Sequence, residues 1–344
     1  YEIPGSLVGS EMCIRYRVGA TGLVGRNIIQ LCEKNFNSDV EYSLFASKSS
    51  EGIEIKINDK RFAVKELKKE NIEEYDISLF SAGGERSKEY AKEFVNKGSF
   101  VIDNSSVFRM NEEVPLVVYG INENEITSDS KLISNPNCTT MGLVMALKPL
   151  HDRYILSSMT PVAYQAVSGS GSKALQSLEN ETLLGDKLEP DNKGTYYSNP
   201  IARNVIPLAG SLTENGYSDE EMKFLHESRK ILSIPNLIVE PSNARVGVRT
   251  GHGTFCSALF ENEIDVEECS ELLNNFEGVE VWNKSLPTPI DVEGKSEVLV
   301  SRIRQGLSSK NILNFWVVSD NLLKGAALNA VQIANLLRNY DFSK

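Results

Sequence analysis

The first half of the chain alternates short apolar runs with amphipathic segments. The apolar runs predict strands at 40–46, 77–82, 100–103 and 131–134. Apolar residues at helical spacing predict helices at 26–32 and 87–97. Strands that alternate with helices are typical of a parallel sheet with helices on both faces. This part of the chain therefore predicts a doubly wound α/β domain.

The pattern changes after about residue 157. Long β-rich runs at 159–168, 237–249 and 252–260 predict a mixed sheet with few crossover helices. The last strong pattern, 322–339, is an amphipathic helix. A chain of 344 residues is long for one core. We expect a Rossmann-type domain of residues 1–137, completed by 324–344, and an α+β domain of residues 138–323.

A glycine series lies between the expected first strand and first helix. Gly19, Gly22 and Gly25 are spaced G-x-x-G-x-x-G. Glycines there let the backbone approach a pyrophosphate, whose charge the helix N-terminus favours. The Ser81-Ala82-Gly83-Gly84 turn after the next buried strand predicts a second close approach. The candidate contacts with a dinucleotide in these two turns are Gly19, Thr21, Gly22, Leu23, Val24, Gly25, Ser81 and Gly83.

The end of the second strand distinguishes the two nicotinamide cofactors. NAD sites carry an acidic residue there for the ribose hydroxyl, whereas NADP sites carry cations and hydroxyls. Lys48 and Ser49 follow this strand, and Lys48 is the only charge before Glu51. The alternative interpretation is an ordinary polar turn. The sequence favours NADP.

Cys138 stands at the predicted start of a helix over 139–147. Unpaired N–H groups and the helix dipole favour an anion at that position, so a thiol there has a lowered pKa and is a usable nucleophile. Asn137 offers an amide beside the sulfur. The alternative is a small apolar cysteine packed at a helix start.

The chain has three histidines that could act as a general acid or base. His252 lies between two glycines on a predicted loop, where its ring can be approached from several sides. His226 is better explained as an exposed residue of an acidic helix, and His151 as a helix-end residue. His252 is therefore the candidate.

Composition excludes several classes of function. The net charge of −11 argues against a general nucleic-acid or membrane surface. Five cysteines without a C-x-x-C pair indicate free thiols in a reducing, cytoplasmic compartment and no metal site. No apolar run approaches the roughly 18 residues of a membrane span.

Taken together, the motifs resemble the aspartate-semialdehyde dehydrogenase family from Val18 almost to the C-terminus. The strings that carry the resemblance are GATGLVG, DNSSVFRM, SNPNCTT, YQAVSGSG, HESRKIL, RVGVRTGHG and WVVSDNLLKGAA. The resemblance implies NADPH-dependent reduction of L-aspartyl-4-phosphate to the 4-semialdehyde, with release of phosphate. This reaction would serve lysine, threonine, methionine and diaminopimelate biosynthesis, in a homodimer or tetramer.

The resemblance also implies roles for individual residues. Cys138 would be the nucleophile, His252 the acid/base and Gln165 the group that orients the thioester. Arg245 would bind the substrate carboxylate and Glu227 its amine, although a solvated helix charge explains Glu227 from the residues alone. The substrate phosphate would meet Arg109 and Lys230, and the nicotinamide end of the cofactor would meet Ser168, Gly169 and Asn321.

The N-terminal residues depart from the family pattern. A central parallel strand is normally a nearly continuous apolar run, but Arg15 and Arg17 stand in the segment that should form it. We interpret residues 1–17 as foreign to the family. Two alternative functions remain open at this point: another acyl-phosphate reductase, such as N-acetylglutamyl-phosphate reductase, and a non-catalytic NADP-binding paralogue.

Overall fold

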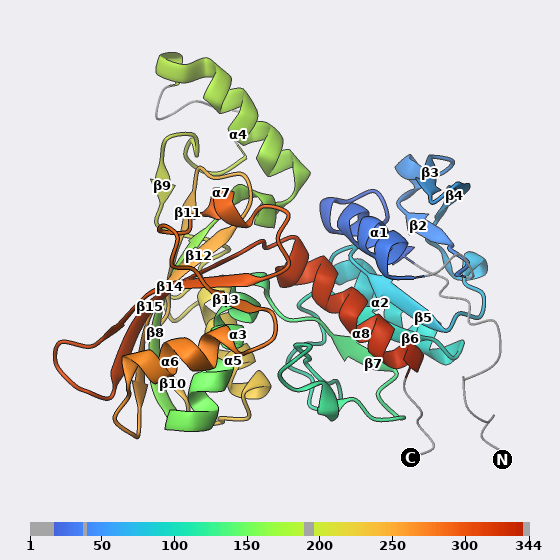
Figure 1. The fold of residues 1–344 in the computed structure, drawn as a ribbon. Helices are drawn as coiled ribbons and strands as arrows, with labels where there is room; N and C mark the ends of the chain where they lie inside the picture. The colour runs from blue at the N-terminus through green and yellow to red at the C-terminus, as the bar shows by residue number, and fades with distance from the viewer. Residues whose placement is uncertain (1–16, 37–39, 189–195, 340–344) are drawn as a thin grey trace. The chain divides into compact units, whose positions relative to one another are not determined.

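The computed structural model describes residues 17–36, 40–188 and 196–339 (Figure 1). It divides into two compact units, Tyr1–Pro136 with Ala326–Lys344 and Asn137–Gly325, and each is described here by itself. The bounds of these units lie within two residues of the domain bounds expected from the sequence. The functional assignment of those domains stays a prediction.

In the first unit, the described residues form a seven-stranded sheet in the order β3-β4-β2-β1-β5-β6-β7. All neighbouring strands pair in parallel except β3 and β4. The first strand is central, as expected, because β1 lies between β2 and β5. The strands are β1 (Arg17–Val18), β2 (Leu44–Ala46), β3 (Glu54–Ile57), β4 (Lys60–Glu66), β5 (Ile77–Phe80), β6 (Phe100–Asp103) and β7 (Leu132–Ser134).

Helices cover both faces of this sheet, because successive strand residues point to opposite sides. Leu79 and Ile102 pack in one apolar cluster with residues of α1 (Leu23–Asn35) and α8 (Leu328–Asn339). Phe80 and Val101 pack on the other face, in a cluster with residues of α2 (Gly84–Asn96). The predicted doubly wound α/β domain is confirmed.

In the second unit, the described residues form an eight-stranded mixed sheet. Its order is β13-β14-β15-β12-β8-β11-β9, and β10 pairs with β8. The strands are β8 (Leu156–Gln165), β9 (Val205–Ile206), β10 (Ile238–Val239), β11 (Ser242–Val246), β12 (His252–Phe260), β13 (Val279–Val281), β14 (Val298–Gln305) and β15 (Ile312–Ser319). The predicted mixed sheet is confirmed.

The buried helix α3 (Cys138–Tyr154) packs against β8, β12, β14 and β15 and contacts two further helices, α5 (Asp219–Ile231) and α6 (Val266–Asn274). Thr139 to Leu147 are all buried along α3, so its first residue is held firmly against the sheet. The remaining helices are α4 (Ser172–Leu184) and α7 (Pro289–Val292).

Several element bounds differ from those predicted. The run at 159–168 leaves the sheet at Gln165, because the next main-chain N–H, that of Ala166, donates to the His252 ring instead of a neighbouring strand. The run at 237–249 splits into β10 and β11 around Pro241, which has no N–H to donate. The C-terminal pattern begins with a π-helical turn, Leu323–Ala327, before α8.

The first helix and the second strand also differ in length from the prediction. Helix α1 begins at Leu23, so Gly25 lies inside it, whereas the pattern placed the helix start at 26. Only Leu44–Ala46 of the predicted strand at 40–46 is extended and paired. The interpretation of residues 1–17 as foreign concerns a segment that, apart from the backbone of Arg17, lies outside the described residues. No helix of the described part is long and apolar enough to cross a membrane.

Candidate functional site

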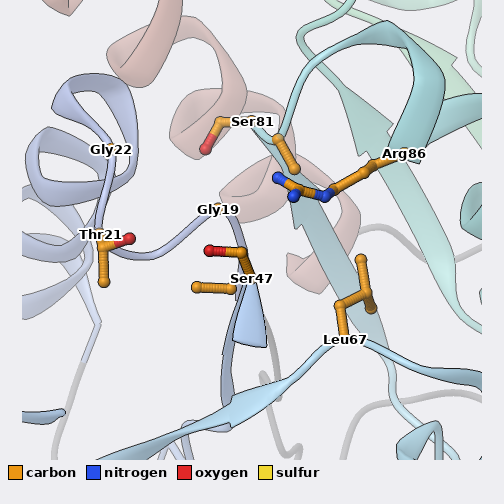
Figure 2. Close-up of a pocket in the computed structure, with 9 residues that line it drawn as sticks. Gly19, Thr21, Gly22, Ser47, Leu67, Ser81 and Arg86 are labelled. Atoms are coloured by element: carbon orange, nitrogen blue, oxygen red, sulfur yellow. The ribbon is translucent and has the colours of Figure 1, made fainter. Parts of the chain in front are cut away.

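The glycine turn between β1 and α1 forms one wall of a pocket of about 180 Å³ (Figure 2). The other walls come from the ends of β2, β4 and β5 and from the first turn of α2. The lining residues are Gly19, Thr21, Gly22, Ala46, Ser47, Leu67, Ser81, Ala82 and Arg86. Such a pocket at the carboxyl ends of parallel strands is where doubly wound sheets bind ligands.

The three glycines of the turn serve different purposes. A Cβ on Gly19, whose φ is +90°, would lie 2.7 Å from the carbonyl oxygen of Ser81. A Cβ on Gly25 would overlap the carbonyl oxygen of Gly19, so Gly25 permits close packing of α1 on the turn. A Cβ on Gly22 would be 3.5 Å from its nearest neighbour, which is ordinary contact. No protein atom therefore needs the space beside Gly22, which is left open to a ligand.

The pocket brings together four of the predicted cofactor residues, Gly19, Thr21, Gly22 and Ser81. Six others do not line it, namely Leu23, Val24, Gly25, Lys48, Ser49 and Gly83. Sequence reasoning missed Arg86, the third residue of α2, which points into the pocket (Figure 2). Its signal in the sequence was an arginine shortly after the glycine-rich turn at 81–84.

In the second unit, Cys138 is the first residue of α3 and is partly buried. Asn137 caps the helix, because its side-chain oxygen accepts the main-chain N–H groups of Thr139 and Thr140 over 3.0 and 3.3 Å. The predicted placement of Cys138 at a helix N-terminus is thus confirmed. The Asn137 amide is not free beside the sulfur as expected, since its nitrogen donates to Glu220 over 2.9 Å.

Helix α5 presents two acidic residues to the segment that precedes Cys138. Glu227 is buried, and its carboxylate accepts the main-chain N–H of Asn137 over 2.7 Å. Glu220, almost two turns earlier, accepts from the side-chain amides of Asn137 and Gln165, the latter over 3.2 Å. Lys223 donates to Glu220 over 2.5 Å. The roles implied for Glu227 and Lys230 toward a substrate stay predictions.

Glu220 and Lys223 were missed by sequence reasoning. The spacing Glu220-x-x-Lys223 repeats as Glu227-x-x-Lys230 one heptad later, so the sequence alone offers two equivalent pairs. Although burial raises the pKa of the Glu220 carboxyl, the Lys223 ammonium and the hydrogen bonds from Lys223 and the two amides lower it to about 2. Glu220 is therefore ionised at neutral pH.

His252 is the first residue of β12 and is buried, so the expectation that it lies on an open loop is wrong. The main-chain N–H of Ala166 donates to its Nδ1 over 2.9 Å. Burial lowers the pKa of His252 to about 3, and the nearby Arg245 guanidinium contributes to this decrease. The Glu220 carboxylate has a weaker effect in the opposite direction. The ring is thus neutral at pH 7 and carries its proton on Nε2, which has no hydrogen-bond partner within the described residues.

The side chains around His252 come from three strand ends and one turn. Arg245 lies directly opposite Gln165 in the β11–β8 pairing and donates through Nη1 to the carbonyl of Ala166 over 2.8 Å. A Cβ on Gly169 would lie 3.2 Å from Nε2 of His252 and 3.3 Å from Nη1 of Arg245. The structure therefore gathers Gln165, Gly169, Arg245 and His252.

Asn321 joins the two turns that flank this cluster. Its side chain donates to the Ser168 hydroxyl over 2.9 Å and accepts the main-chain N–H of Gly251 over 2.9 Å. The predicted nicotinamide-end residues, Ser168, Gly169 and Asn321, are thus neighbours. Arg109 belongs to the first unit, where its Nη2 donates to the carbonyl of Asn104 over 2.8 Å. Its pairing with Lys230 on a phosphate stays a prediction.

Comparison with known proteins gives matches along nearly the whole chain. Residues 17–129 match the family model described as semialdehyde dehydrogenase, NAD binding domain, and residues 147–324 match semialdehyde dehydrogenase, dimerisation domain. The chain is 44% identical over 328 residues to an aspartate-semialdehyde dehydrogenase of Aquifex aeolicus, covering 93% of this chain and 96% of that one. The corresponding enzyme of Bacillus subtilis is 40% identical, with coverage of 93% and 96%.

Solved structures are similar as well. Aspartate semialdehyde dehydrogenase II from Vibrio cholerae superposes with a TM-score of 0.91 at 37% identity, covering 96% of this chain and 99% of that one. A structure of the Candida albicans enzyme with NADP has a TM-score of 0.75 at 25% identity, with coverage of 96% and 99%. These matches extend over both units of the chain.

Proposed function

Since this chain belongs to the aspartate-semialdehyde dehydrogenase family, we propose that it reduces L-aspartyl-4-phosphate to L-aspartate 4-semialdehyde with NADPH and releases phosphate. It is an oxidoreductase with an NAD(P)-binding domain and a dimerisation domain. The relatives are named aspartate-semialdehyde dehydrogenase, and the match to this chain covers almost their full length. We therefore set aside the two alternative functions considered above. We further propose that two copies of the chain form the working enzyme.

The pocket of the first unit fits one end of a dinucleotide. Gly22 leaves space that no protein atom requires, and the N-terminus of α1 follows it directly, so a phosphate there would meet main-chain N–H groups. Ser47, just after β2, adds its hydroxyl to the pocket, and Arg86 adds its guanidinium from α2. Bound NADPH would supply the hydride for the reduction.

The observation that carries the proposal is Cys138 at the capped N-terminus of α3. In this mechanism its thiolate attacks the acyl carbon of the substrate, so that a carbon–sulfur bond forms and the phosphate leaves with the electron pair of the carbon–oxygen bond. Glu227 holds the main chain just before Cys138, and the Asn137 side chain caps the turn just after it. The absence of a side chain at Gly325 lets the π-helical turn Leu323–Ala327 approach the cysteine, since a Cβ there would lie 2.7 Å from the Cβ of Cys138.

His252 acts in this proposal as a hydrogen-bond donor toward the oxygen of the acyl group. Nδ1 already accepts the N–H of Ala166, so the exchangeable proton of the neutral ring is on Nε2. Nε2–H donates a hydrogen bond to the oxygen as it gains negative charge from the hydride, which lowers the barrier to reduction. The ring keeps its proton throughout, and the charge leaves with the Cys138 thiolate when the carbon–sulfur bond breaks and the aldehyde forms.

We propose that Arg245 binds the substrate carboxylate, because only one of its donors is known to be used by the main chain and a guanidinium fork matches a carboxylate. For the substrate ammonium we favour Glu220 over Glu227. Both carboxylates accept hydrogen bonds, but Glu220 is ionised and accepts from Gln165, whereas Glu227 holds the main chain of Asn137. Gln165 then orients the acyl group between them.

The reverse reaction tests the proposal. Reduction of NADP by aspartate semialdehyde should require phosphate and should be abolished by Cys138→Ala, with NADP binding unchanged within a few-fold. Cys269→Ala, which removes a buried thiol of α6, is the matched control and should keep its activity. Substantial turnover by Cys138→Ala would refute the covalent mechanism, and an inactive wild-type enzyme would refute the proposed function.

A further inference from the structure

Among the residues that line the pocket in the described structure, Arg86 is the only charged one. It is the third residue of α2, after the turn that ends β5. Figure 2 shows its guanidinium directed into the space between Ser47 and Ser81, away from the body of α2. A cation thus enters the pocket from the side opposite the glycine turn.

Within residues 17–36, 40–188 and 196–339, Arg86 has no hydrogen bond or ion pair with another residue. In a protein of net charge −11, a guanidinium that is directed into a pocket and lacks an acidic partner there is available to an anionic ligand. Lys48, the cation expected from the sequence, does not line the pocket. Its charge instead adds to the effect of Lys68, which lowers the pKa of the half-buried Glu66 carboxyl.

The position of Arg86 indicates which anion it meets. The pyrophosphate of a dinucleotide belongs at the N-terminus of the first helix, beside the glycine turn. The end of the second strand belongs to the ribose that carries the 2′ substituent. Arg86 shares the pocket with Ala46, the last residue of β2, and with Ser47, which follows it.

We propose that Arg86, rather than Lys48, provides the charge that selects NADP over NAD, by binding the 2′-phosphate together with the hydroxyl of Ser47. A guanidinium offers two parallel donors to one phosphate, which a lysine cannot do. This inference rests on the proposed function, which supplies the nicotinamide cofactor, and assigns the cofactor preference to one residue of α2.

Equilibrium binding of nucleotides to the full-length protein tests whether Arg86 binds the 2′-phosphate, and it does not depend on turnover. Calorimetric titration with NADP, NAD, 2′,5′-ADP and 5′-AMP should be carried out on wild type, Arg86→Met and Arg86→Lys. Arg86→Met should weaken binding of NADP and 2′,5′-ADP by about 10- to 100-fold, with little change for NAD and 5′-AMP. Arg86→Lys should recover part of the loss.

Two matched controls remove a charge elsewhere. Lys88→Met alters an exposed cation on α2 outside the pocket lining, and Lys48→Met alters the cation expected from the sequence. Both should weaken NADP binding far less than Arg86→Met does. Equal weakening of NADP and NAD in Arg86→Met would overturn the proposal, as would unchanged NADP binding or a larger loss in Lys48→Met.

The test separates this inference from the proposed function. The titrations can be repeated in the Cys138→Ala background, where no turnover occurs. A wild-type enzyme that is inactive toward the semialdehyde refutes the function, whatever Arg86 does. An active enzyme whose NADP preference survives Arg86→Met refutes only the role of Arg86.

Discussion

The buried imidazole of His252 makes the stability of the protein depend on pH. Burial lowers its pKa to about 3, and the nearby Arg245 adds to the effect. In the unfolded chain a histidine titrates near pH 6.5. Between these two values the unfolded chain binds a proton that the folded protein does not, so the free energy of unfolding rises with pH. The stability that depends on a neutral His252 is fully present above pH 6.5 and is lost progressively as the pH falls toward 3.

The size of the effect follows from the gap between the two pKa values. Each pH unit below 6.5 costs about 1.36 kcal/mol until the folded-state pKa is reached. At pH 5 the contribution of His252 to the loss is therefore about 2 kcal/mol. His252→Asn removes the titration, and its amide oxygen can still accept the N–H of Ala166. The cavity that it leaves lowers stability equally at every pH.

Urea unfolding at pH 7.5 and pH 5 measures this contribution directly. Wild type should lose about 2 kcal/mol more between the two pH values than His252→Asn does. His226→Asn, which changes an exposed histidine on α5, should behave like wild type. If wild type and His252→Asn lost the same free energy, the ring would be accessible to protons in the folded state and the neutral-imidazole mechanism would be wrong.

Two further substitutions separate folding from binding. Gly25→Ala should lower the free energy of unfolding by about 1–3 kcal/mol because its Cβ would overlap the carbonyl of Gly19. Gly22→Ala should leave the thermal midpoint nearly unchanged and weaken NADP binding. A destabilised Gly22→Ala beside a stable Gly25→Ala would contradict the geometry. Glu220→Gln should raise KM for the semialdehyde and so lower kcat/KM by about tenfold or more, with NADP binding unchanged. The control Glu214→Gln, which changes an exposed residue, should have no effect. An unaltered KM in Glu220→Gln would favour Glu227 as the residue that binds the ammonium.

Local patterns were sufficient where an element depends on its own residues. Strands β6 (Phe100–Asp103) and β12 (His252–Phe260) have the bounds that their apolar runs predict. Cys138 begins α3 because Asn137, one position earlier, caps the first turn through its own side chain. The alternation of apolar runs and amphipathic segments likewise predicted the class of fold, since it depends on periodicity along the chain.

Other features depend on hydrogen bonds between distant segments. Strand β8 stops at Gln165 because the next N–H is taken by His252, which lies 86 residues from Ala166 in the sequence. The Asn137 amide, expected to be free, is occupied by Glu220 on α5. No pattern local to either segment contains this information.

The sequence by itself determined the alternation of strands and helices, the glycine turn and the position of Cys138 at a helix start. Only the tertiary structure distinguishes Glu220, which accepts from Gln165, from Glu227, which has the same spacing to a lysine, and only it shows that Arg86 rather than Lys48 lines the pocket. The reason is geometric. Parallel pairing of β2 and β5 on either side of β1 brings the end of β2 and the start of α2 to the same edge of the sheet, and this proximity has no counterpart in sequence distance.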